Sequence, residues 1–212
     1  MMPAVSQPIP PAYRAVMWGA TPLLKWWGTM TVEGLEVLPP DGPCLVVANH
    51  DSYWDPVAVG TGALPVRPVR ALAKASMWGN PLVGKVLDGM GQIPIKRGES
   101  DVAAMERAVQ ELRDGACIGV FPEGTRSLGR ELRARSGVGR LAEAVPEAQV
   151  VCVAISGTTD VPRFPKRSRV RLQFFRPEGG GLQPGEAHGD FAARLVRQCR
   201  ALAPIAKAGR RP

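Results

Sequence analysis

Short apolar runs alternate with segments of helical periodicity along most of this chain, and this alternation constrains the fold more than any other feature. Residues 44–48 read C-L-V-V-A and residues 117–121 read C-I-G-V-F, continuous runs typical of strands that are covered on both faces. Between them, residues 102–112 repeat apolar side chains at helical spacing, and Gly115 ends that helix. The pattern predicts an α/β domain with a mixed, largely parallel central sheet flanked by helices.

The remaining elements follow from the same reading. In the last helix, Phe191, Leu195, Cys199 and Leu202 share one face, and the arginines at 194, 197 and 200 are expected to point away from it. We expect one domain at residues 31–206, followed by a basic tail at residues 207–212. Further strands are predicted at residues 35–38, 69–73, 92–95, 150–155 and 170–174, and further helices at residues 80–87, 138–144 and 191–202.

Residues 1–30 are predicted to be an amphipathic membrane-associating segment. Their most apolar stretch, residues 15–30, has 16 residues and one lysine, whereas a spanning helix needs about 20 residues. Trp18, Trp26 and Trp27 suit a lipid–water interface. A helix packed on the domain is the alternative interpretation. No basic region followed by an apolar run and a cleavage site is present, so no secretory signal is expected.

The excess of basic residues indicates an anionic partner. The chain has 27 Lys and Arg against 19 Asp and Glu, a net charge of +8, which suits nucleic acid, a phosphorylated substrate or an acidic lipid surface. One basic cluster lacks interleaved aromatics apart from Phe164, and the chain has no nucleic-acid motif, so we expect lipid headgroups and no nucleic-acid partner. The cluster consists of Arg163, Lys166, Arg167, Arg169 and Arg171.

The four cysteines lie far apart, without a C-x-x-C pair or a nearby histidine. This spacing argues against a zinc site and a disulfide framework, and we expect neither a metal nor a cofactor. Buried thiols of a reducing, cytosolic compartment are the expected interpretation.

Polar residues follow three of the predicted strands: Asn49 and His50 with Asp55, then Lys96 and Arg97, then residues 123–126. Because parallel strands end at one edge of a sheet, these loops are expected to share a site. No serine-hydrolase elbow, zinc-protease motif, P-loop or dinucleotide motif is present. A histidine with a carboxylate and no enzyme nucleophile favours direct transfer, in which imidazole takes a proton from an acceptor hydroxyl. A simple turn at residues 49–55 is the alternative.

The motifs carry a resemblance to a known family. Residues 49–55, N-H-D-S-Y-W-D, fit the N-H-x-x-x-x-D motif of the glycerolipid acyltransferases, which include lysophosphatidic acid acyltransferases, and residues 121–127 match that family's F-P-E-G-T-R-S. Residues 91–97, G-Q-I-P-I-K-R, resemble its second block, and the likeness covers residues 42–176. It implies transfer of a fatty acyl group from acyl-CoA or acyl carrier protein to a lysophospholipid hydroxyl, first of all that of 1-acylglycerol-3-phosphate. It also implies a peripheral or monotopic location at the cytoplasmic face of the cell membrane.

The resemblance implies a role for each motif residue. His50 would be the general base and Asp55 its orienting partner, and Asn49 would shape the turn. No covalent acyl-enzyme would be needed. Glu123 would hold an arginine or an acceptor hydroxyl, and the arginines would bind phosphate. The acceptor site would be shaped by Arg97, Glu123, Gly124, Thr125 and Arg126.

Two positions depart from the family pattern. Lys96 stands where many members have Asp or Asn, and Cys152 stands where the fourth block, which is linked to the acyl donor, has proline. A reactive Cys152 is the alternative to a structural thiol, although an apolar strand would raise its pKa. His188 lies in a Gly-rich stretch and is expected to be exposed and without a catalytic role. Two alternatives remain for the whole chain: an acyltransferase of the same family that acts on another lipid or glycolipid acceptor, and a catalytically silent membrane-binding module.

Overall fold

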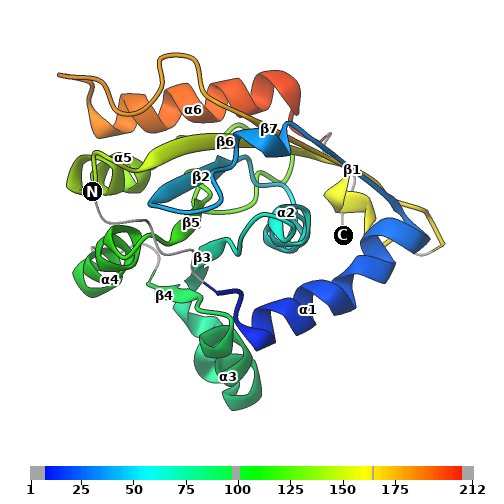
Figure 1. The fold of residues 1–212 in the computed structure, drawn as a ribbon. Coiled ribbons are helices and arrows are strands. Elements are labelled where there is room, and N and C mark those ends of the chain that lie inside the picture. Colours follow the sequence, from blue (N-terminus) through cyan, green and yellow to red (C-terminus); the bar gives the residue numbers. More distant parts are fainter. Residues whose placement is uncertain (1–7, 97–100, 164, 207–212) are drawn as a thin grey trace.

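The described residues form a seven-stranded sheet in the order β1-β7-β6-β2-β5-β3-β4 (Figure 1). The computed structural model describes residues 8–96, 101–163 and 165–206. Neighbouring strands pair in parallel, except β6 and β7, which are antiparallel. The prediction of a mixed, largely parallel sheet flanked by helices is therefore confirmed.

The predicted elements occur within three residues of their expected positions, with the exceptions given below. The strands are β1 (Thr29–Glu33), β2 (Cys44–Ala48), β3 (Arg70–Lys74), β4 (Ile93–Ile95), β5 (Cys117–Val120), β6 (Gln149–Ser156) and β7 (Arg169–Phe175). The α-helices are α1 (Pro11–Thr21), α2 (Asp55–Ala63), α3 (Pro81–Gly89), α4 (Val102–Arg113), α5 (Gly137–Ala144) and α6 (His188–Leu202). A π-helical segment, η1 (Pro22–Trp27), follows α1, and 3-10 turns form η2 (Leu35–Val37), η3 (Ala75–Gly79) and η4 (Thr158–Asp160).

Strand β2 lies at the centre of the domain and serves two cores. Leu45 and Val47 belong to the cluster beneath α4, α5 and α6, while Cys44, Val46 and Ala48 belong to the cluster beneath α2 (Figure 1). Successive side chains of a strand point to opposite faces, so a strand covered on both sides is apolar throughout. Burying each of its larger side chains contributes roughly 1.5–3 kcal/mol. This burial fixes the end of β2, where the Asn49-His50 pair begins.

Helix α2 was not predicted, because two glycines weaken the helical pattern of residues 55–63. A Cβ on Gly60 would lie 2.8 Å from Tyr13 and Met17 of α1, and one on Gly62 would lie 2.6 Å from Leu172 of β7. The glycines therefore allow α2 to pack closely between α1 and the sheet. This packing fixes the N-terminus of α2, which begins with Asp55.

The strand predicted at residues 35–38 is wrong, because this segment forms the 3-10 turn η2. Gly34 has φ +68°, in the left-handed region, and a Cβ there would meet the Phe174 carbonyl at 2.0 Å. The chain turns sharply after β1 and cannot continue as a strand. The buried Leu38 then packs into the core beneath α2.

The N-terminal region has one packed face and one exposed face. Tyr13 and Met17 are buried, and the Tyr13 hydroxyl accepts a hydrogen bond from Val69 N at 3.0 Å. Trp18 and Trp26 are 76% and 78% exposed. The region continues into the sheet, since β1 begins at residue 29 and pairs with β7. No helix within the described residues is long and apolar enough to span a bilayer.

Candidate active site

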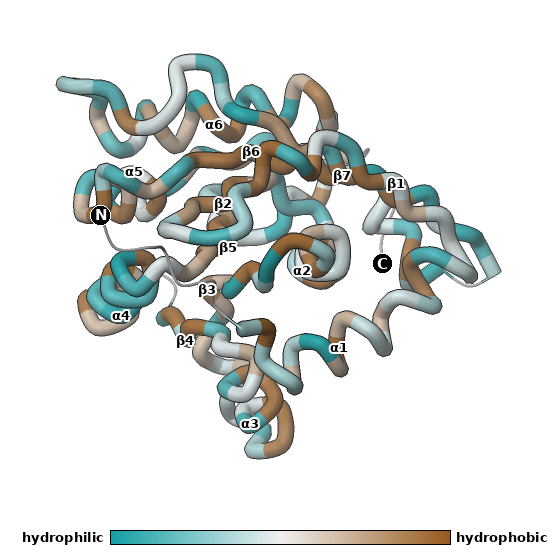
Figure 2. The backbone as a smooth tube through the Cα atoms, viewed as in Figure 1, coloured by the Kyte–Doolittle hydropathy of each residue, from teal (hydrophilic) through white to brown (hydrophobic). Residues whose placement is uncertain are grey.

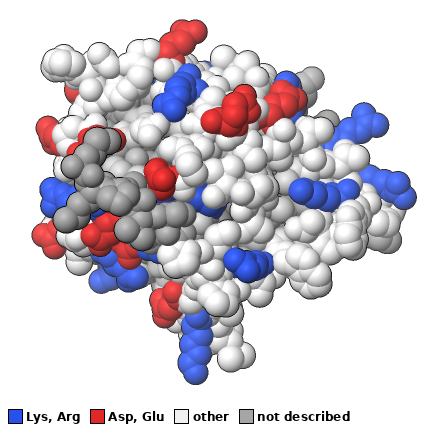
Figure 3. Space-filling model, in the orientation of Figure 1, with Lys and Arg blue, Asp and Glu red and all other residues white. Residues whose placement is uncertain are grey.

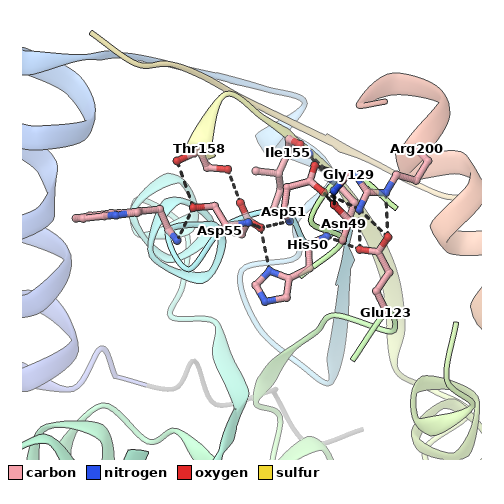
Figure 4. Close-up of polar contacts among 12 residues, drawn as sticks. Asn49, His50, Asp51, Asp55, Glu123, Gly129, Ile155, Thr158 and Arg200 are labelled. Atoms are coloured by element: carbon pink, nitrogen blue, oxygen red, sulfur yellow. Dashed lines mark hydrogen bonds and ion pairs between the residues drawn. The ribbon is translucent and has the colours of Figure 1, made fainter. Parts of the chain in front are cut away.

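Loops from three neighbouring parallel strands meet at the carboxyl edge of the sheet (Figure 4). Asn49 and His50 follow β2, residues 121–127 follow β5, and Thr158 follows β6. The Asn49 amide exchanges two hydrogen bonds of 2.8 Å with the backbone of Ile155. It therefore fixes the turn, in the shaping role that the resemblance implied.

His50 and Asp55 form a buried pair. His50 Nδ1 lies 2.9 Å from Asp55 Oδ2, and that same oxygen accepts the backbone N–H groups of Asp51 at 2.7 Å and Ser52 at 2.8 Å. The Thr158 hydroxyl donates to the other carboxylate oxygen. Asp55 is also the first residue of α2, where a negative charge is favoured. These contacts hold the carboxylate in one orientation.

The contacts of Asp55 define what the His50 ring can do. A carboxylate oxygen surrounded by donors calls for an N–H at His50 Nδ1, which leaves the lone pair of the neutral ring on Nε2. Figure 4 shows Nε2 on the side of the ring away from Asp55. The Phe121 ring lies against the imidazole, with the ring centroids 4.6 Å apart. His50 can therefore accept a proton at Nε2 while Asp55 stabilises the resulting imidazolium.

His50 opens into a cavity of about 890 Å³. This volume is within the range of small-molecule sites. Apolar side chains of α1, β3, η3 and α3 form most of its wall, among them Met17, Leu72, Met77, Leu82 and Val86. Its polar residues include Tyr53, Lys74, Gln92, Thr125 and Arg126. The cavity thus combines an apolar wall with cationic groups near the His50 imidazole.

Thr125 and Arg126 are placed in this cavity together with His50. The Arg126 guanidinium lies over the Tyr53 ring, 3.7 Å from its centroid. Gly124 lines a different cavity, of about 790 Å³, on the side of α4 and α5. Arg97 lies outside the described residues. Two of the predicted acceptor-binding residues therefore share a cavity with His50.

Glu123 is buried behind the imidazole and binds two groups. Its Oε2 accepts the His50 backbone N–H at 2.6 Å, and both of its oxygens pair with the Arg200 guanidinium. Glu123 therefore holds an arginine, one of the two roles expected of it. The same guanidinium pairs with Asp51.

Arg200 is the site residue that the sequence did not reveal. Its position in α6 predicted an outward-facing side chain, but that side chain is only 12% exposed. Burial by itself lowers the pKa of the guanidinium, and the hydrogen bonds to Asp51 and Glu123 outweigh burial and raise that pKa above its ordinary value. The signal available in the sequence was indirect: two acidic residues inside the reactive motifs required a cation from elsewhere in the chain.

The four cysteines are all buried and free. The pKa of the Cys152 thiol is raised by its hydrogen bond with Cys199 and by burial. Nucleophilic cysteines need a low pKa, so the environment favours a structural thiol.

Other basic and histidine side chains have mostly structural contacts. Within the predicted basic cluster, Arg163 and Lys166 pair with Asp160, and Arg171 pairs with Glu33. Lys and Arg side chains are spread over the face in Figure 3 and are not gathered in one patch. His188 is the first residue of α6, not a loop residue, and its Nε2 lies 3.2 Å from Glu143.

A mostly parallel sheet that carries a buried His–Asp pair beside an F-P-E-G-T-R-S loop defines an acyltransferase domain. A family model described as Acyltransferase matches residues 29–162, more than half of the chain, so the chain belongs to this family. The resemblance to glycerolipid acyltransferases is confirmed by this match and by named relatives.

Two relatives show how far the likeness extends. A 1-acyl-sn-glycerol-3-phosphate acyltransferase of Bacillus subtilis is 24% identical over 85% of this chain and 87% of its own length. A chloroplastic 1-acyl-sn-glycerol-3-phosphate acyltransferase of Brassica napus is 31% identical over 54% of this chain, which spans only 33% of that relative. A crystal structure of the 1-acyl-sn-glycerophosphate acyltransferase PlsC from Thermotoga maritima superposes on 90% of this chain and on 79% of its own chain. The TM-score is 0.67 and the sequence identity is 23%. That structure shares the fold.

Proposed function

We propose that this chain transfers a fatty acyl group from acyl-CoA or acyl carrier protein to the hydroxyl of a lysophospholipid. The proposed acceptor is 1-acylglycerol-3-phosphate and the product is phosphatidic acid. The observation that carries the proposal is the His50–Asp55 pair, which opens into a largely apolar cavity that also contains Arg126. The names of the Bacillus subtilis and Brassica napus relatives support the choice of acceptor.

The geometry supports a direct transfer. His50 Nε2 takes the proton of the acceptor hydroxyl as its oxygen forms a bond to the thioester carbonyl carbon. The C–S bond then breaks, and the imidazolium returns the proton to the thiolate sulfur. Asp55 stabilises the imidazolium between these steps. Arg126, and Arg97 by the family resemblance, bind the acceptor phosphate, since a guanidinium pairs with phosphate through two hydrogen bonds.

The first test is thiol release from palmitoyl-CoA by the purified chain, with and without lysophosphatidate. The wild type should release thiol only with the acceptor, and His50→Ala should lose at least about 10²-fold in rate. His188→Ala is the matched control, because His188 is the other histidine and pairs with Glu143, away from the cavity residues. Full activity in folded His50→Ala would refute the base assignment.

The same assay with other substrates distinguishes the possible donors and acceptors. In one set of reactions palmitoyl-acyl carrier protein is the donor in place of palmitoyl-CoA. In another, 1-acylglycerol, which lacks the phosphate, is the acceptor in place of lysophosphatidate. A lyso-ornithine lipid forms a third acceptor arm, because a Lyso-ornithine lipid O-acyltransferase of Pseudomonas aeruginosa is 35% identical over 65% of this chain. Turnover with that lipid alone would replace the proposed acceptor. Vesicle binding without turnover in any arm would favour a silent membrane-binding module.

We also propose that the chain binds the cytoplasmic face of the cell membrane as a peripheral or monotopic protein, and that it binds no nucleic acid. Trp18 and Trp26 are exposed beside buried residues of the same region. Helix α3 carries hydrophobic residues (Figure 2), and its exposed Leu82 lines the cavity. Aromatic side chains of this kind favour the headgroup region. Anionic lipids would add electrostatic attraction to the basic chain.

Membrane binding is tested by sedimentation with phosphatidylglycerol vesicles, beside an oligonucleotide titration. Changing both tryptophans to serine should weaken vesicle binding, whereas Leu202→Ser, which alters an exposed apolar residue on α6, should not. Tight, salt-dependent binding to the oligonucleotide and none to vesicles would contradict this assignment.

A further inference from the structure

Arg200 joins the two reactive motifs from a part of the chain that contains neither. It lies near the end of α6, outside residues 29–162 that the family model matches. All three guanidinium nitrogens are used: Nη1 pairs with Asp51 Oδ2 at 2.8 Å, Nη2 with Asp51 Oδ1 at 3.0 Å, and Nε with Glu123 Oε1 at 3.0 Å. Nη2 also contacts both Glu123 oxygens. The planar guanidinium of arginine can donate to two carboxylates at once, which the single ammonium group of a lysine does less well.

Both carboxylates that Arg200 binds hold the backbone around His50. Glu123 Oε2 accepts the His50 N–H at 2.6 Å. The Ser127 hydroxyl donates to Asp51, and Ser127 N donates to His50 O at 2.8 Å. Asp51 N in turn donates to Asp55 Oδ2 at 2.7 Å. Arg200 is thus linked through Glu123 to the His50 N–H, and through Asp51 and Ser127 to the His50 carbonyl, without touching the imidazole (Figure 4).

The charge balance of this network depends on Arg200. The side chains of Asp51 and Glu123 are 8% and 2% exposed, so neither carboxylate is well solvated. With Asp55 they place three carboxylates around one histidine, and Arg200 is the cation that pairs with two of them. Removing the cation leaves buried negative charge without compensation, which either forces the acids apart or favours the protonated imidazole.

We propose that Arg200 is a positioning residue for the transfer reaction: through Asp51 and Glu123 it sets the position of the His50 backbone and balances the charge of the two carboxylates beside it. The kinetic effect of this inference rests on the proposed function, whereas the ion-pair geometry does not depend on which substrate is used. Arg200 fixes the base, so its loss lowers kcat while the KM for the acceptor changes little. The acid limb of the kcat/KM profile moves to higher pH, because uncompensated carboxylates favour the imidazolium. The other ionisable groups around the cavity, Tyr53, Lys74 and Arg126, are unchanged.

The test compares Arg200→Met and Arg200→Lys with Arg197→Met, a change to an exposed arginine one turn away on the same helix. Arg200→Met should lower kcat by roughly 10²-fold, the scale of a misplaced catalytic group, and Arg200→Lys should recover part of the loss. Arg197→Met should match the wild type. Thermal unfolding identifies a variant that fails to fold, in which case Arg200→Lys carries the test.

A second readout does not depend on turnover. The chain has two histidines, so the imidazole signals of the labelled protein can be assigned in NMR spectra with His188→Gln. The His50 signal should titrate at higher pH in Arg200→Met than in Arg197→Met. This shift without activity in any protein would leave the positioning role intact and overturn the proposed substrates. Unchanged kcat, pH profile and His50 titration in a folded Arg200 variant would overturn the positioning role.

Discussion

The side-chain amide of Asn49 forms a two-way bridge to the backbone of Ile155. Its nitrogen donates to the Ile155 carbonyl and its oxygen accepts the Ile155 N–H, both at 2.8 Å, and Asn49 is fully buried. The bridge continues the pairing of β2 with β6 one residue past the end of β2, at the point where His50 must be fixed.

Asn49→Ala is therefore expected to destabilise the domain. The change leaves a buried N–H and a buried carbonyl without partners, at about 1–3 kcal/mol each. Asn80→Ala is the comparison, since it removes only the exposed N-cap bonds of α3, worth about 1 kcal/mol. Urea unfolding measures both. A smaller loss for Asn49→Ala than for Asn80→Ala would contradict the bridging role.

Gly124→Ala is expected to be more harmful than another glycine substitution of equal backbone strain. Gly124 and Gly42 have φ of +70° and +73°, so alanine is strained at both, by about 1–2 kcal/mol. A Cβ on Gly124 would also lie 2.5 Å from Arg135 Nε, whereas one on Gly42 would meet nothing within 4 Å. The difference between the two variants isolates the Arg135 contact.

The measurements for Gly124→Ala are urea unfolding and the KM for lysophosphatidate. Displacement of the neighbouring Thr125 and Arg126 should raise that KM in Gly124→Ala but not in Gly42→Ala. Equal unfolding free energies and equal KM values in the two variants would show that Arg135 adjusts freely around the new methyl group.

The sequence predicted the strands and the motifs because both are local patterns. The apolar run of β2 and the F-P-E-G-T-R-S loop after β5 need no knowledge of distant residues, and each was found in its expected place. Helix α2 was missed because its glycines lower helix propensity, and their use is visible only where Tyr13 and Leu172 pack against them. Tertiary packing overrode local preference at that point.

Arg200 was missed for a different physical reason. Helical periodicity assigns apolar side chains to the core and charged side chains to solvent. It therefore predicts that an arginine next to the apolar face of α6 is exposed. It cannot show that two carboxylates from other loops lie over the last turn of the helix. Arg200 and Asp51 are 149 positions apart in the sequence. A local sequence pattern contains no information about such a contact, so the ion-pair network could be found only in the structure.

Tyr53→Ala is expected to weaken acceptor binding through Arg126. The guanidinium lies 3.7 Å from the centroid of the Tyr53 ring, and an exposed cation–π contact contributes about 0.5–1 kcal/mol. Losing it should raise the KM for lysophosphatidate about two- to fivefold, with kcat little changed. Tyr53→Phe keeps the ring and should keep the wild-type KM. A KM that rises equally for 1-acylglycerol would show that the phosphate is not involved.

The raised pKa of Cys152 predicts how its thiol reacts as the pH is changed. The Cys152 pKa is raised by its hydrogen bond with Cys199 and by burial, and only the thiolate reacts with disulfide reagents. Raising the pH from 7 to 9 should therefore leave Cys152 unlabelled by Ellman's reagent in the native protein. All four cysteines are buried, so labelling should approach four equivalents only after unfolding in guanidinium.

Cys152→Ala is expected to keep most of the wild-type transfer rate, because direct transfer uses no enzyme nucleophile. Mass spectrometry of the wild type, quenched during turnover with palmitoyl-CoA, should show no acylated protein. If Cys152 formed a thioester with the acyl group, the quenched protein would gain the mass of one palmitoyl group, and Cys152→Ala would abolish both that species and turnover. That result would replace direct attack by a two-step transfer, with His50 acting on the acyl-enzyme.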